Sequence, residues 1–465
     1  MSFVTPSRRR LFHLAGAAAL TSSLAPSMAS SLSAATRSPV VGRVLAIADM
    51  HSAYERTARL LAAFEAEVRS QPVPHVIAID GDIFEHGNVV SVRSGGAIDW
   101  AFLAEAVRIA PTVVNLGNHD NDLTPDLAEV VARMRGLGVI VVSNIVDART
   151  GEGYAAPTAT APFGARSLRI VGLATHALNT YPKASRDQLS IPAPAEWANA
   201  HLADLTRGAD PVLVLSHAGV VADRSILPLL PDGSLIIGGH DHLLFQHRQG
   251  RSAYAHTGSW TNAYTAADFH ADGSVSVASH PIAADAPSSP RLQALIDATL
   301  AETLTDADRA VLGQGAEALS LGDTGRRIAA GFAQAAGADA GFIGHTTLGT
   351  GAPAGPITRY MFDSIVRFDG RLMTAEAPRA QLEDFMARAN QDRPIPLDQR
   401  TGDFLYGALA TGSQGATARI VTTDWCATNQ AEYFGTTSLA FTEVADLKVK
   451  PIALSALIET PSTPG

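Results

Sequence analysis

Short apolar runs, separated by polar or amphipathic stretches, organise the chain from Arg43 to about residue 280. The runs that predict buried strands are 44–48, 75–79, 111–114, 139–142, 169–173, 211–215 and 234–237. After the first run, Leu60, Leu61 and Phe64 recur on one face, which predicts a helix over 55–69. This alternation of strands and helices predicts an α/β fold.

Polar residues that can bind a metal directly follow five of these runs. They are Asp49, His51, Asp82, Asn118, His217, His240 and His242. Because ligands gather at the carboxyl ends of strands in α/β sheets, we expect these side chains to meet at one site. A histidine considered alone is more often structural or exposed. The shared position at the end of a strand is what favours a binding role here.

The chemistry of these donors indicates the kind of metal site. Imidazole, carboxylate and amide groups without a thiolate suit zinc, manganese or iron. Seven donors exceed the needs of one tetrahedral ion and fit two divalent ions that share a carboxylate, for which Asp82 is the natural bridge. Two ions ~3.5–4 Å apart clamp an in-line displacement and activate water, as hydrolysis of a phosphate ester requires. His119 adjoins Asn118 and is placed to act on the substrate, with a downstream Asp to orient its imidazole.

Composition narrows the class of protein. A chain of 465 residues exceeds the size at which one core keeps growing, so two domains are expected. Its 46% hydrophobic and 17% charged residues are typical of a globular protein. The net charge of -10 argues against a nucleic-acid polymer as partner, and the single cysteine, Cys426, excludes an intramolecular disulfide.

The first residues have the pattern of an export signal. An arginine cluster, 8–10, precedes a weakly apolar stretch, 14–25, and small residues then offer cleavage after Ala29 or Ala35. This order resembles a bacterial twin-arginine signal. It implies that 1–35 is a signal peptide, that the twin-arginine translocase exports the protein, and that the location is periplasmic or secreted. The apolar stretch is too short and too interrupted for a stable membrane anchor. A disordered tail is the alternative.

Five short blocks connect the chain to a known family. They are Asp49-x-His51, Gly81-Asp82, Gly117-Asn118-His119-Asp120, Ser216-His217 and Gly239-His240-x-His242. In their order and their placement after strands, the blocks resemble those of the calcineurin-like metallophosphoesterases, over roughly residues 43–280. The resemblance implies a four-layer α/β/β/α sandwich and metal-dependent hydrolysis of phosphoric esters.

Within that superfamily the chain is most similar to the periplasmic 5′-nucleotidase branch, because Asp122 follows the third block. The resemblance implies two ions with defined ligands. One ion would be held by Asp49, His51, Asp82 and His242, and the other by Asp82, Asn118, His217 and His240. It also implies that His119 contacts the phosphoryl oxygens or protonates the leaving group. Asp122 would orient His119, and Asp120 is the weaker candidate for that role.

The same branch has a C-terminal domain that supplies the substrate pocket, and about 321–458 of this chain resembles it. The matching segments are Gly355-Pro356-Ile357-Thr358, Val366-Arg367-Phe368-Asp369-Gly370 and 425–434. Their positions imply that Phe368 and Phe434, or Tyr433, stack on a base, with a place in the core as the equal alternative. The chain lacks the branch's Asn-x-Gly-Gly-x-Arg element, and Arg367 is the candidate replacement for its arginine.

The sequence thus predicts four segments: a signal peptide at 1–35, a metal domain at 40–284, a linker and connecting helix at 285–320, and a smaller α/β substrate domain at 321–465. The predicted substrate is a small phosphate monoester, in particular a nucleotide. Alternatives at the same metal pair are a phosphodiester, such as a 2′,3′-cyclic nucleotide, and the sulfur oxyanion ester cleaved by thiol sulfate hydrolases, which resemble this branch. A non-catalytic binding protein would have lost a ligand, and none is missing.

Overall fold

Two six-stranded sheets form the first part of the protein. The computed structural model describes residues 38–209, 211–410 and 415–459, so the predicted signal peptide lies outside the described residues. The first sheet consists, in spatial order, of β14 (Val275–Pro281), β13 (Ala263–His270), β1 (Val40–Ala48), β2 (His75–Asp80), β3 (Thr112–Asn115) and β4 (Ile140–Val142). The second consists of β11 (Leu244–Gln249), β12 (Ser252–Thr257), β10 (Leu235–Gly238), β9 (Val212–His217), β7 (Arg166–Ala174) and β6 (Thr158–Phe163).

The central strands of each sheet run parallel. In the first sheet β1, β2, β3 and β4 are parallel neighbours, and β13 and β14 pair antiparallel at the edge. In the second sheet β12, β10, β9 and β7 are parallel, with antiparallel β11 and β6 at the edges. The carboxyl ends of the parallel strands in each sheet therefore lie along one side of that sheet.

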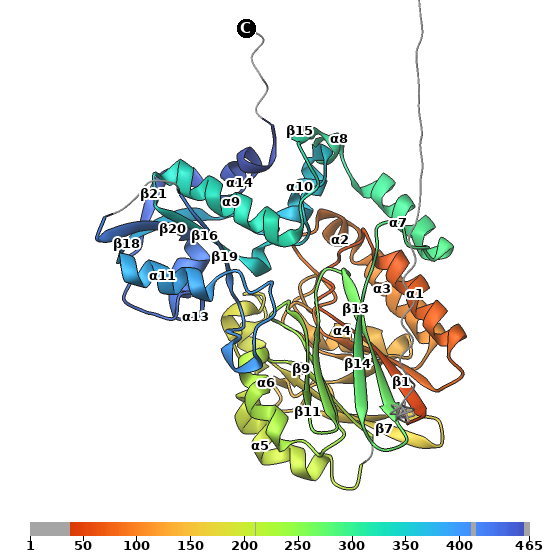
Figure 1. The fold of residues 1–465 in the computed structure, drawn as a ribbon. Coiled ribbons are helices and arrows are strands. Elements are labelled where there is room, and N and C mark those ends of the chain that lie inside the picture. The colour runs from red at the N-terminus through yellow and green to blue at the C-terminus, as the bar shows by residue number, and fades with distance from the viewer. Residues whose placement is uncertain (1–37, 210, 411–414, 460–465) are drawn as a thin grey trace, which may run out of the picture. The chain divides into compact units, whose positions relative to one another are not determined.

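The sheets pack face to face, with helices outside. In β1, Val44 and Ala46 point into the apolar layer between the sheets, whereas Leu45 and Ile47 pack against helices. The helices outside the first sheet are α1 (Thr57–Ser70), α2 (Val89–Ser94), α3 (Ala97–Ile109) and α4 (Leu127–Gly136). Those outside the second are α5 (Pro194–Leu205) and α6 (Val220–Ile226). The predicted four-layer α/β/β/α architecture is confirmed (Figure 1).

Short elements follow the two large sheets. They are α7 (Pro290–Thr303), α8 (Asp306–Arg309) and β15 (Val311–Gly315), which pairs antiparallel with β17 (Gly355–Thr358). The helix expected at the start of this region is confirmed as α7, which lies against α2 and α3. A further pair, β5 (Val146–Asp147) and β8 (Leu189–Ser190), lies earlier in the chain. The division into domains at 285–320 stays a prediction.

The C-terminal part is built on a smaller mixed sheet. In spatial order its strands are β19 (Leu405–Leu409), β16 (Ala340–Gly344), β20 (Thr417–Thr423), β18 (Arg371–Pro378) and β21 (Thr442–Lys448). The helices of this part are α9 (Leu321–Ala336), α10 (Arg359–Ile365), α11 (Arg379–Arg388), α12 (Asp424–Thr428), α13 (Gln430–Tyr433) and α14 (Val449–Leu457). Phe342 of β16 packs with Phe385 of α11, whereas the neighbouring Ile343 packs in the cluster that contains Phe332 of α9. Helices therefore cover both faces of this α/β sheet (Figure 1).

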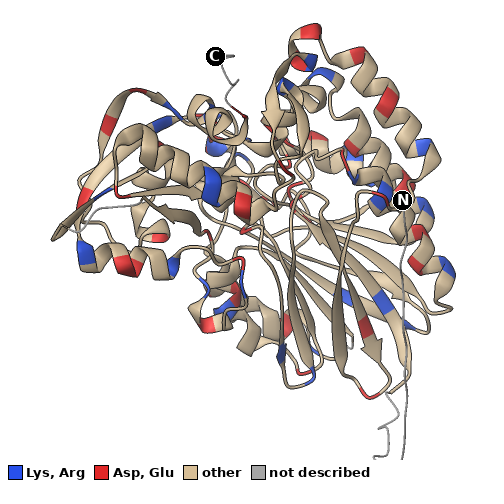
Figure 2. Cartoon of the chain, turned by 45° about the horizontal axis from the view of Figure 1, so that its top comes forward, with Lys and Arg blue, Asp and Glu red and all other residues tan. Residues whose placement is uncertain are grey.

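The expected secondary structure agrees closely with that of the molecule. Each apolar run that predicted a strand overlaps one of β1, β2, β3, β4, β7, β9 and β10, and the helix expected over 55–69 is α1. In Figure 2 acidic and basic residues are interspersed over the helices. No helix in the described part of the chain has both the length and the hydropathy of a membrane span.

Candidate active site

The predicted metal donors come together where strands of the two large sheets end. Three of the strands, β1, β2 and β3, belong to the first sheet, and β9 and β10 belong to the second. Asp82, after β2, lies between the donors that follow the strands of the first sheet and those that follow the strands of the second. Its Oδ2 atom is 3.1 Å from Nε2 of His217 and 3.7 Å from Nε2 of His51. One carboxylate oxygen thus faces imidazoles from both sheets.

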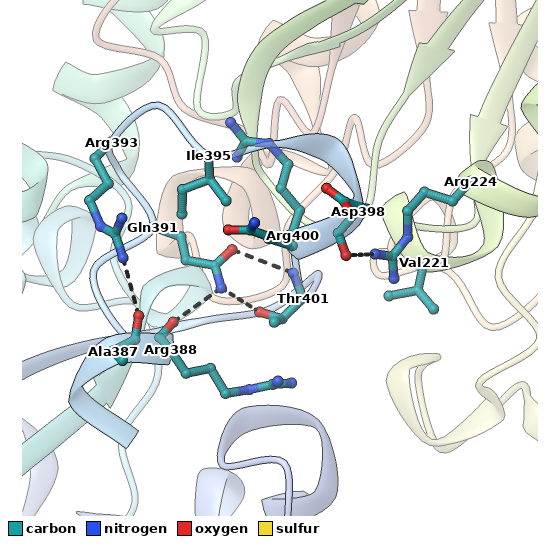
Figure 3. A pocket seen from close by; sticks show the side chains of 11 residues that line it. Val221, Arg224, Ala387, Arg388, Gln391, Arg393, Ile395, Asp398, Arg400 and Thr401 are labelled. Atoms are coloured by element: carbon teal, nitrogen blue, oxygen red, sulfur yellow. Dashed lines mark hydrogen bonds between the residues drawn. The ribbon is translucent and has the colours of Figure 1, made fainter. Parts of the chain in front are cut away.

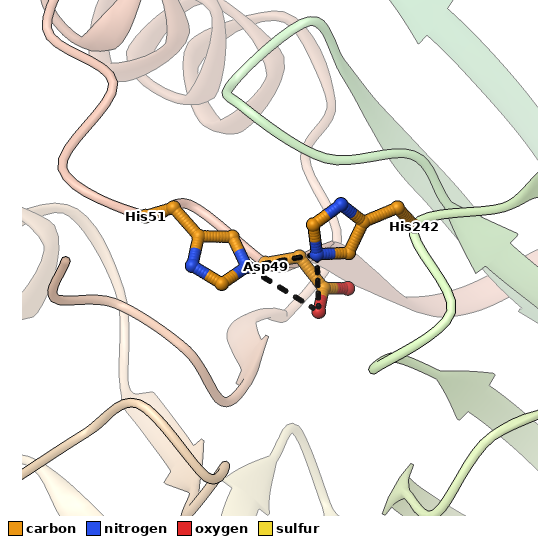
Figure 4. A group of neighbouring side chains, drawn as sticks. All are labelled: Asp49, His51 and His242. Atoms are coloured by element: carbon orange, nitrogen blue, oxygen red, sulfur yellow. Dashed lines mark hydrogen bonds and ion pairs between the residues drawn. The ribbon is translucent and has the colours of Figure 1, made fainter. Parts of the chain in front are cut away.

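Asp49, His51 and His242 form the first group of donors, shown in Figure 4. The two imidazole Nε2 atoms are 2.8 Å apart. The Oδ1 atom of Asp49 lies 3.7 Å from Nε2 of His242 and 4.0 Å from Nε2 of His51. All three donor atoms therefore point at one small space.

Asp82, His217 and His240 form the second group. The amide of Asn118 joins it, because Oδ1 of Asn118 lies 2.9 Å from Nδ1 of His240. The other carboxylate oxygen of Asp82, Oδ1, accepts a hydrogen bond of 2.7 Å from the backbone N–H of His119. This bond fixes the Asp82 side chain so that its Oδ2 faces the imidazoles.

Backbone strain accompanies most of these donors. The donors with positive φ, between 50° and 76°, are Asp49, His51, Asp82, His240 and His242. Such left-handed conformations cost on the order of 1–3 kcal/mol each for residues other than glycine, and they cluster at functional sites. The tight turns directly after the strands bring these side chains back over the ends of the sheets.

The second nitrogen of two of these imidazoles faces an acceptor. His217 donates through Nδ1 to the backbone carbonyl of Asp80 at 2.6 Å. Nδ1 of His51 faces the buried carboxylate of Glu85, with Oε2 at 3.4 Å. A proton on Nδ1 leaves the lone pair on Nε2, which is the nitrogen that points into the site.

The residues present fit divalent metal ions. Oδ2 of Asp49 is buried without a hydrogen-bond partner among the residues that the structure describes, although a carboxylate oxygen is strongly polar. Burial lowers the pKa of His240 to about 3, and it lowers the pKa of His242 well below its ordinary value, so both rings are neutral and offer lone pairs. Neutral imidazoles and carboxylates converging without thiolates are a typical donor set for such cations.

His119 lies beside the donors with its own carboxylate partner. Its Nδ1 atom is 3.0 Å from Oδ2 of Asp122. Its side chain is 23% exposed, more than those of His51, His217 and His242, at 2%, 0% and 8%. Although burial opposes the effect, the carboxylates of Asp122 and Asp82 raise the pKa of His119 well above its ordinary value. Asp120 instead accepts hydrogen bonds from the backbone N–H groups of Gly117 and Ile83. Of the two candidate partners, Asp122 is therefore the one that contacts the imidazole.

A cavity of about 540 Å³ extends from the donors to the C-terminal part of the protein. His119, Asn118 and His242 line one end. The exposed rings of Phe368 and Trp425 line the other, with 43% and 44% of their surfaces accessible. Polar residues complete that end of the lining: Arg371, Asp369, Asp403, Asp424, Thr346, Thr347, Thr423 and Thr428.

Two of the three predicted substrate residues lie elsewhere. Phe434 is only 4% exposed and packs edge-on against Phe342 and Phe385 in the core of the C-terminal sheet, so of its two predicted places it occupies the one in the core and not the one beside a base. Arg367 is buried, with its guanidinium 4.2 Å from the centre of the Trp260 ring. Neither residue lines the cavity, whereas Phe368 does.

The sequence reasoning missed several residues of the site. Trp425 takes the place expected for Phe434, because α12 begins at Asp424 and presents its first turn to the cavity. Arg371 lines the cavity where Arg367 was expected, and it pairs with Glu443 at 2.8 Å. The one signal in the sequence that could have identified Arg371 is its position four residues after Arg367. Nothing in the sequence marks Glu85, because no strand ends there.

Comparisons with known proteins agree with this geometry. Residues 42–244 match the family model described as calcineurin-like phosphoesterase. The 5′-nucleotidase precursor of Thermus thermophilus is similar in structure, with a TM-score of 0.59, 18% identity, and coverage of 89% of this chain and 96% of that one. The sulfate thiohydrolase SoxB of Thermus thermophilus, in complex with glycerol, has a TM-score of 0.62 and 14% identity, covering 90% and 94%.

The 5′-nucleotidase of Candida albicans SC5314 has a TM-score of 0.60 and 11% identity, with coverage of 90% of this chain and 98% of that one. A comparison with curated proteins gives no match. At these identities the similarity concerns the fold. It extends over the two large sheets and the C-terminal sheet alike, since about nine-tenths of the chain is covered in each case.

Proposed function

We propose that this chain, whose residues 42–244 match the calcineurin-like phosphoesterases, is an exported, metal-dependent enzyme that cleaves phosphate monoesters, nucleotides in particular. The observation that carries this proposal is the cavity that joins the metal donors to the exposed rings of Phe368 and Trp425. Such a cavity suits a substrate with a phosphate at one end and a flat base at the other.

We assign two divalent ions to the site, of zinc, manganese or iron. The residues that would hold one ion are Asp49, His51, Asp82 and His242, and those that would hold the other are Asp82, Asn118, His217 and His240. Bound ions of this kind neutralise phosphoryl charge and activate water as a nucleophile. The convergence of both groups on Asp82 supports this carboxylate as the shared ligand.

We assign His119 and Asp122 to proton transfer. Asp122 holds Nδ1–H of the imidazole at 3.0 Å, which leaves Nε2 for the substrate. In this role Nε2–H of His119 contacts the phosphoryl oxygens and gives its proton to the departing oxygen. The charge of Asp122 favours the protonated ring that a general acid needs.

The far end of the cavity supports an uncharged leaving group. Asp369, Asp403 and Asp424 face that end together with Arg371, which is already paired with Glu443. A nucleoside carries no charge and offers ribose hydroxyls to carboxylates and an aromatic face to Phe368 and Trp425. A second anionic group at that end would meet acidic neighbours.

The alternatives are different esters at the same metal pair. A phosphodiester such as a 2′,3′-cyclic nucleotide would leave one fewer oxygen for the ions. The sulfur oxyanion ester of a thiol sulfate is the other alternative, and SoxB is similar to this chain in fold only. A substrate panel separates them: adenosine 5′-monophosphate, glycerol phosphate, a 2′,3′-cyclic nucleotide and a thiol sulfate, each with and without added Mn²⁺.

We expect the highest kcat/KM for the nucleotide. In Trp425→Ala its KM is expected to rise about 10-fold, because base–aromatic stacking contributes on the order of 1–3 kcal/mol. The KM for glycerol phosphate, which has no ring, should stay unchanged. Trp197→Ala is the matched control, since Trp197 lies on α5 and stacks on His201, outside the cavity. Absence of turnover on every phosphate ester, with metal shown to be bound, would contradict the proposal.

A further inference from the structure

A second cavity, of about 490 Å³, lies between α6 and the segment that follows α11. Arginines dominate its lining: Arg224, Arg388, Arg393 and Arg400. Figure 3 shows Arg224 and Arg393 at opposite sides of the cavity, with Gln391 and Thr401 between them. The lining shares no residue with the cavity that contains the metal donors.

The positive charge of this second cavity exceeds the negative charge near it, because four arginines face one carboxylate in the lining, Asp398, and one beside Arg388, that of Glu432. Asp398 is the one acidic residue in the lining, and it accepts a hydrogen bond of 2.7 Å from Arg224 through its backbone carbonyl. Arg388 donates to the carbonyl of Glu432 at 2.7 Å, and Arg393 donates to the carbonyl of Ala387 at 3.1 Å. A carbonyl satisfies a donor but leaves the net charge of a guanidinium in place.

Arg400 differs from the other three. It is only 6% exposed, and its Nε is buried without a hydrogen-bond partner among the residues that the structure describes. Its contact is with the ring of Phe245, whose centre is 4.1 Å from Cζ of Arg400. Buried guanidinium groups normally have an acceptor, because removing their charge from water is otherwise costly.

A purely structural role accounts for part of the cluster. Arg224 ties α6 to the loop at Asp398, and Arg393 ties its own loop back to Ala387 of α11. Arg388 ties α11 to α13 at Glu432. That role does not account for Arg400, which ties nothing through a hydrogen bond. It also does not explain why four arginines line one cavity whose lining holds a single carboxylate. A ligand that supplies negative charge and several acceptors would satisfy both observations.

We propose that this cavity binds an oxyanion, a phosphate or sulfate group that is either free or carried on a larger molecule. Arginine is suited to such groups because its planar fork presents parallel N–H donors to two oxygens of a tetrahedral anion. The guanidinium groups of Arg388, Arg393 and Arg400 supply the charge, and Arg224 closes the site from α6.

The test measures anion binding by the metal-loaded, full-length protein. Sodium sulfate is titrated by calorimetry at an ionic strength held constant with sodium chloride, and crystals are soaked in selenate. We expect an anomalous selenate peak among the four arginines. We also expect Arg388→Gln and Arg393→Gln each to weaken sulfate binding at least 5-fold, and Arg400→Gln to abolish it.

Arg248→Gln is the matched control, because Arg248 is an exposed arginine that donates to the backbone carbonyl of Gly250. Its sulfate affinity should equal that of the wild type. A sulfate held at the metal donors would keep its affinity in all the arginine variants, so equal binding in Arg388→Gln and Arg393→Gln overturns the proposal. These two variants keep the test valid if Arg400→Gln does not fold.

A second titration identifies the source of the anion. Methylphosphonate carries a comparable oxyanion on a carbon atom and so represents a group on a larger molecule. Binding of both sulfate and methylphosphonate, lost together in the arginine variants, supports a site for a carried group. Binding of sulfate alone supports a site for a free anion. If the crystal shows a selenate peak while none of the arginine substitutions weakens anion binding in solution, the peak is an adventitious ion only, and the result contradicts the proposal.

Discussion

At the scale of single residues, the imidazoles of the active site differ in what their second nitrogen contacts. His217 donates to a backbone carbonyl, which orients the ring without adding charge. His51 faces Glu85, and His119 faces Asp122. A carboxylate partner both orients an imidazole and raises its basicity. We therefore expect the pair of His119 and Asp122 to govern proton transfer and the pair of His51 and Glu85 to govern metal affinity.

His119→Gln is expected to lower kcat by about 10²- to 10⁴-fold, the range typical for removal of a general acid, with both metals retained. Asp122→Asn should lower kcat less, because the imidazole remains but loses its charged partner. The measurements are steady-state kinetics together with metal content by mass spectrometry. His201→Gln is the control, since His201 is exposed and bonds only a backbone carbonyl. Loss of metal in His119→Gln would show that the residue supports the metal site itself.

Glu85→Gln is expected to weaken binding of the ion assigned to Asp49, His51, Asp82 and His242 about 10- to 100-fold, because removal of a carboxylate partner of a ligating imidazole has that effect. The glutamine keeps an oxygen for the N–H of Gly87, which Oε1 of Glu85 accepts at 2.6 Å, so the loop should keep its shape. Competition with a metal-binding dye measures the affinity. Glu129→Gln, which alters a surface hydrogen bond to Thr124, should bind metal as the wild type does. Unchanged affinity in Glu85→Gln would contradict the orienting role.

At the scale of elements, the loops after β2 and β3 are packed directly against each other. Gly117 lies so close to Asp82 that a Cβ on it would be 2.6 Å from the backbone nitrogen of Asp82 and would also collide with its carboxylate oxygen. The spacing of these two loops therefore depends on the absence of a side chain at position 117. This close approach supports the geometry of Asp82, which faces both groups of donors.

Gly117→Ala is expected to displace Asp82 and to lower metal affinity and kcat together. Thermal unfolding of the metal-loaded variant should begin at a lower temperature, because bound metal stabilises only the folded state. Gly136→Ala is the matched control, since a Cβ at position 136, the last residue of α4, meets no atom within 4 Å. If Gly117→Ala bound both metals normally, the close packing of the two loops would not be what positions Asp82.

The elements also explain which residue assignments succeeded. Strand ends could be predicted because apolar runs and the polar residues after them are adjacent in the sequence, as at Ile79 and Asp82. The assignment of Phe434 failed because short helices intervene. Trp425 lies in the first turn of α12 and faces the cavity, whereas Phe434, just after α13, turns into the core. Apolarity alone does not distinguish these two positions.

At the scale of the whole molecule, the active-site cavity combines distant parts of the chain. Its donors come from the two large sheets, and its aromatic end comes from Phe368 and from Trp425. His345 also links the two parts, because its Nε2 lies 2.7 Å from the backbone carbonyl of Asp241. Neither part alone contains both the metal donors and the aromatic rings.

Export is the prediction that concerns the whole molecule in its cell. Replacement of Arg8, Arg9 and Arg10 by lysine keeps the charge but removes the twin-arginine pattern, so we expect the protein to stay in the cytoplasm in a folded, active form. Phosphatase activity in separated periplasmic and cytoplasmic fractions measures this. A variant with lysine at Arg37 instead, beyond the predicted signal, should be exported normally. Undiminished periplasmic activity in the first variant would contradict the assignment.

The sequence by itself determined the α/β class, seven of the twelve strands of the two large sheets and the polar residues that follow five of them. These are local properties, since periodicity and the order of donors can be followed along the chain. The tertiary structure alone decided that Glu85 faces His51, that Trp425 and not Phe434 lines the cavity, and that four arginines share a second cavity. Those relations depend on how segments far apart in sequence pack, because each side chain's neighbours are set by the fold and not by its own type.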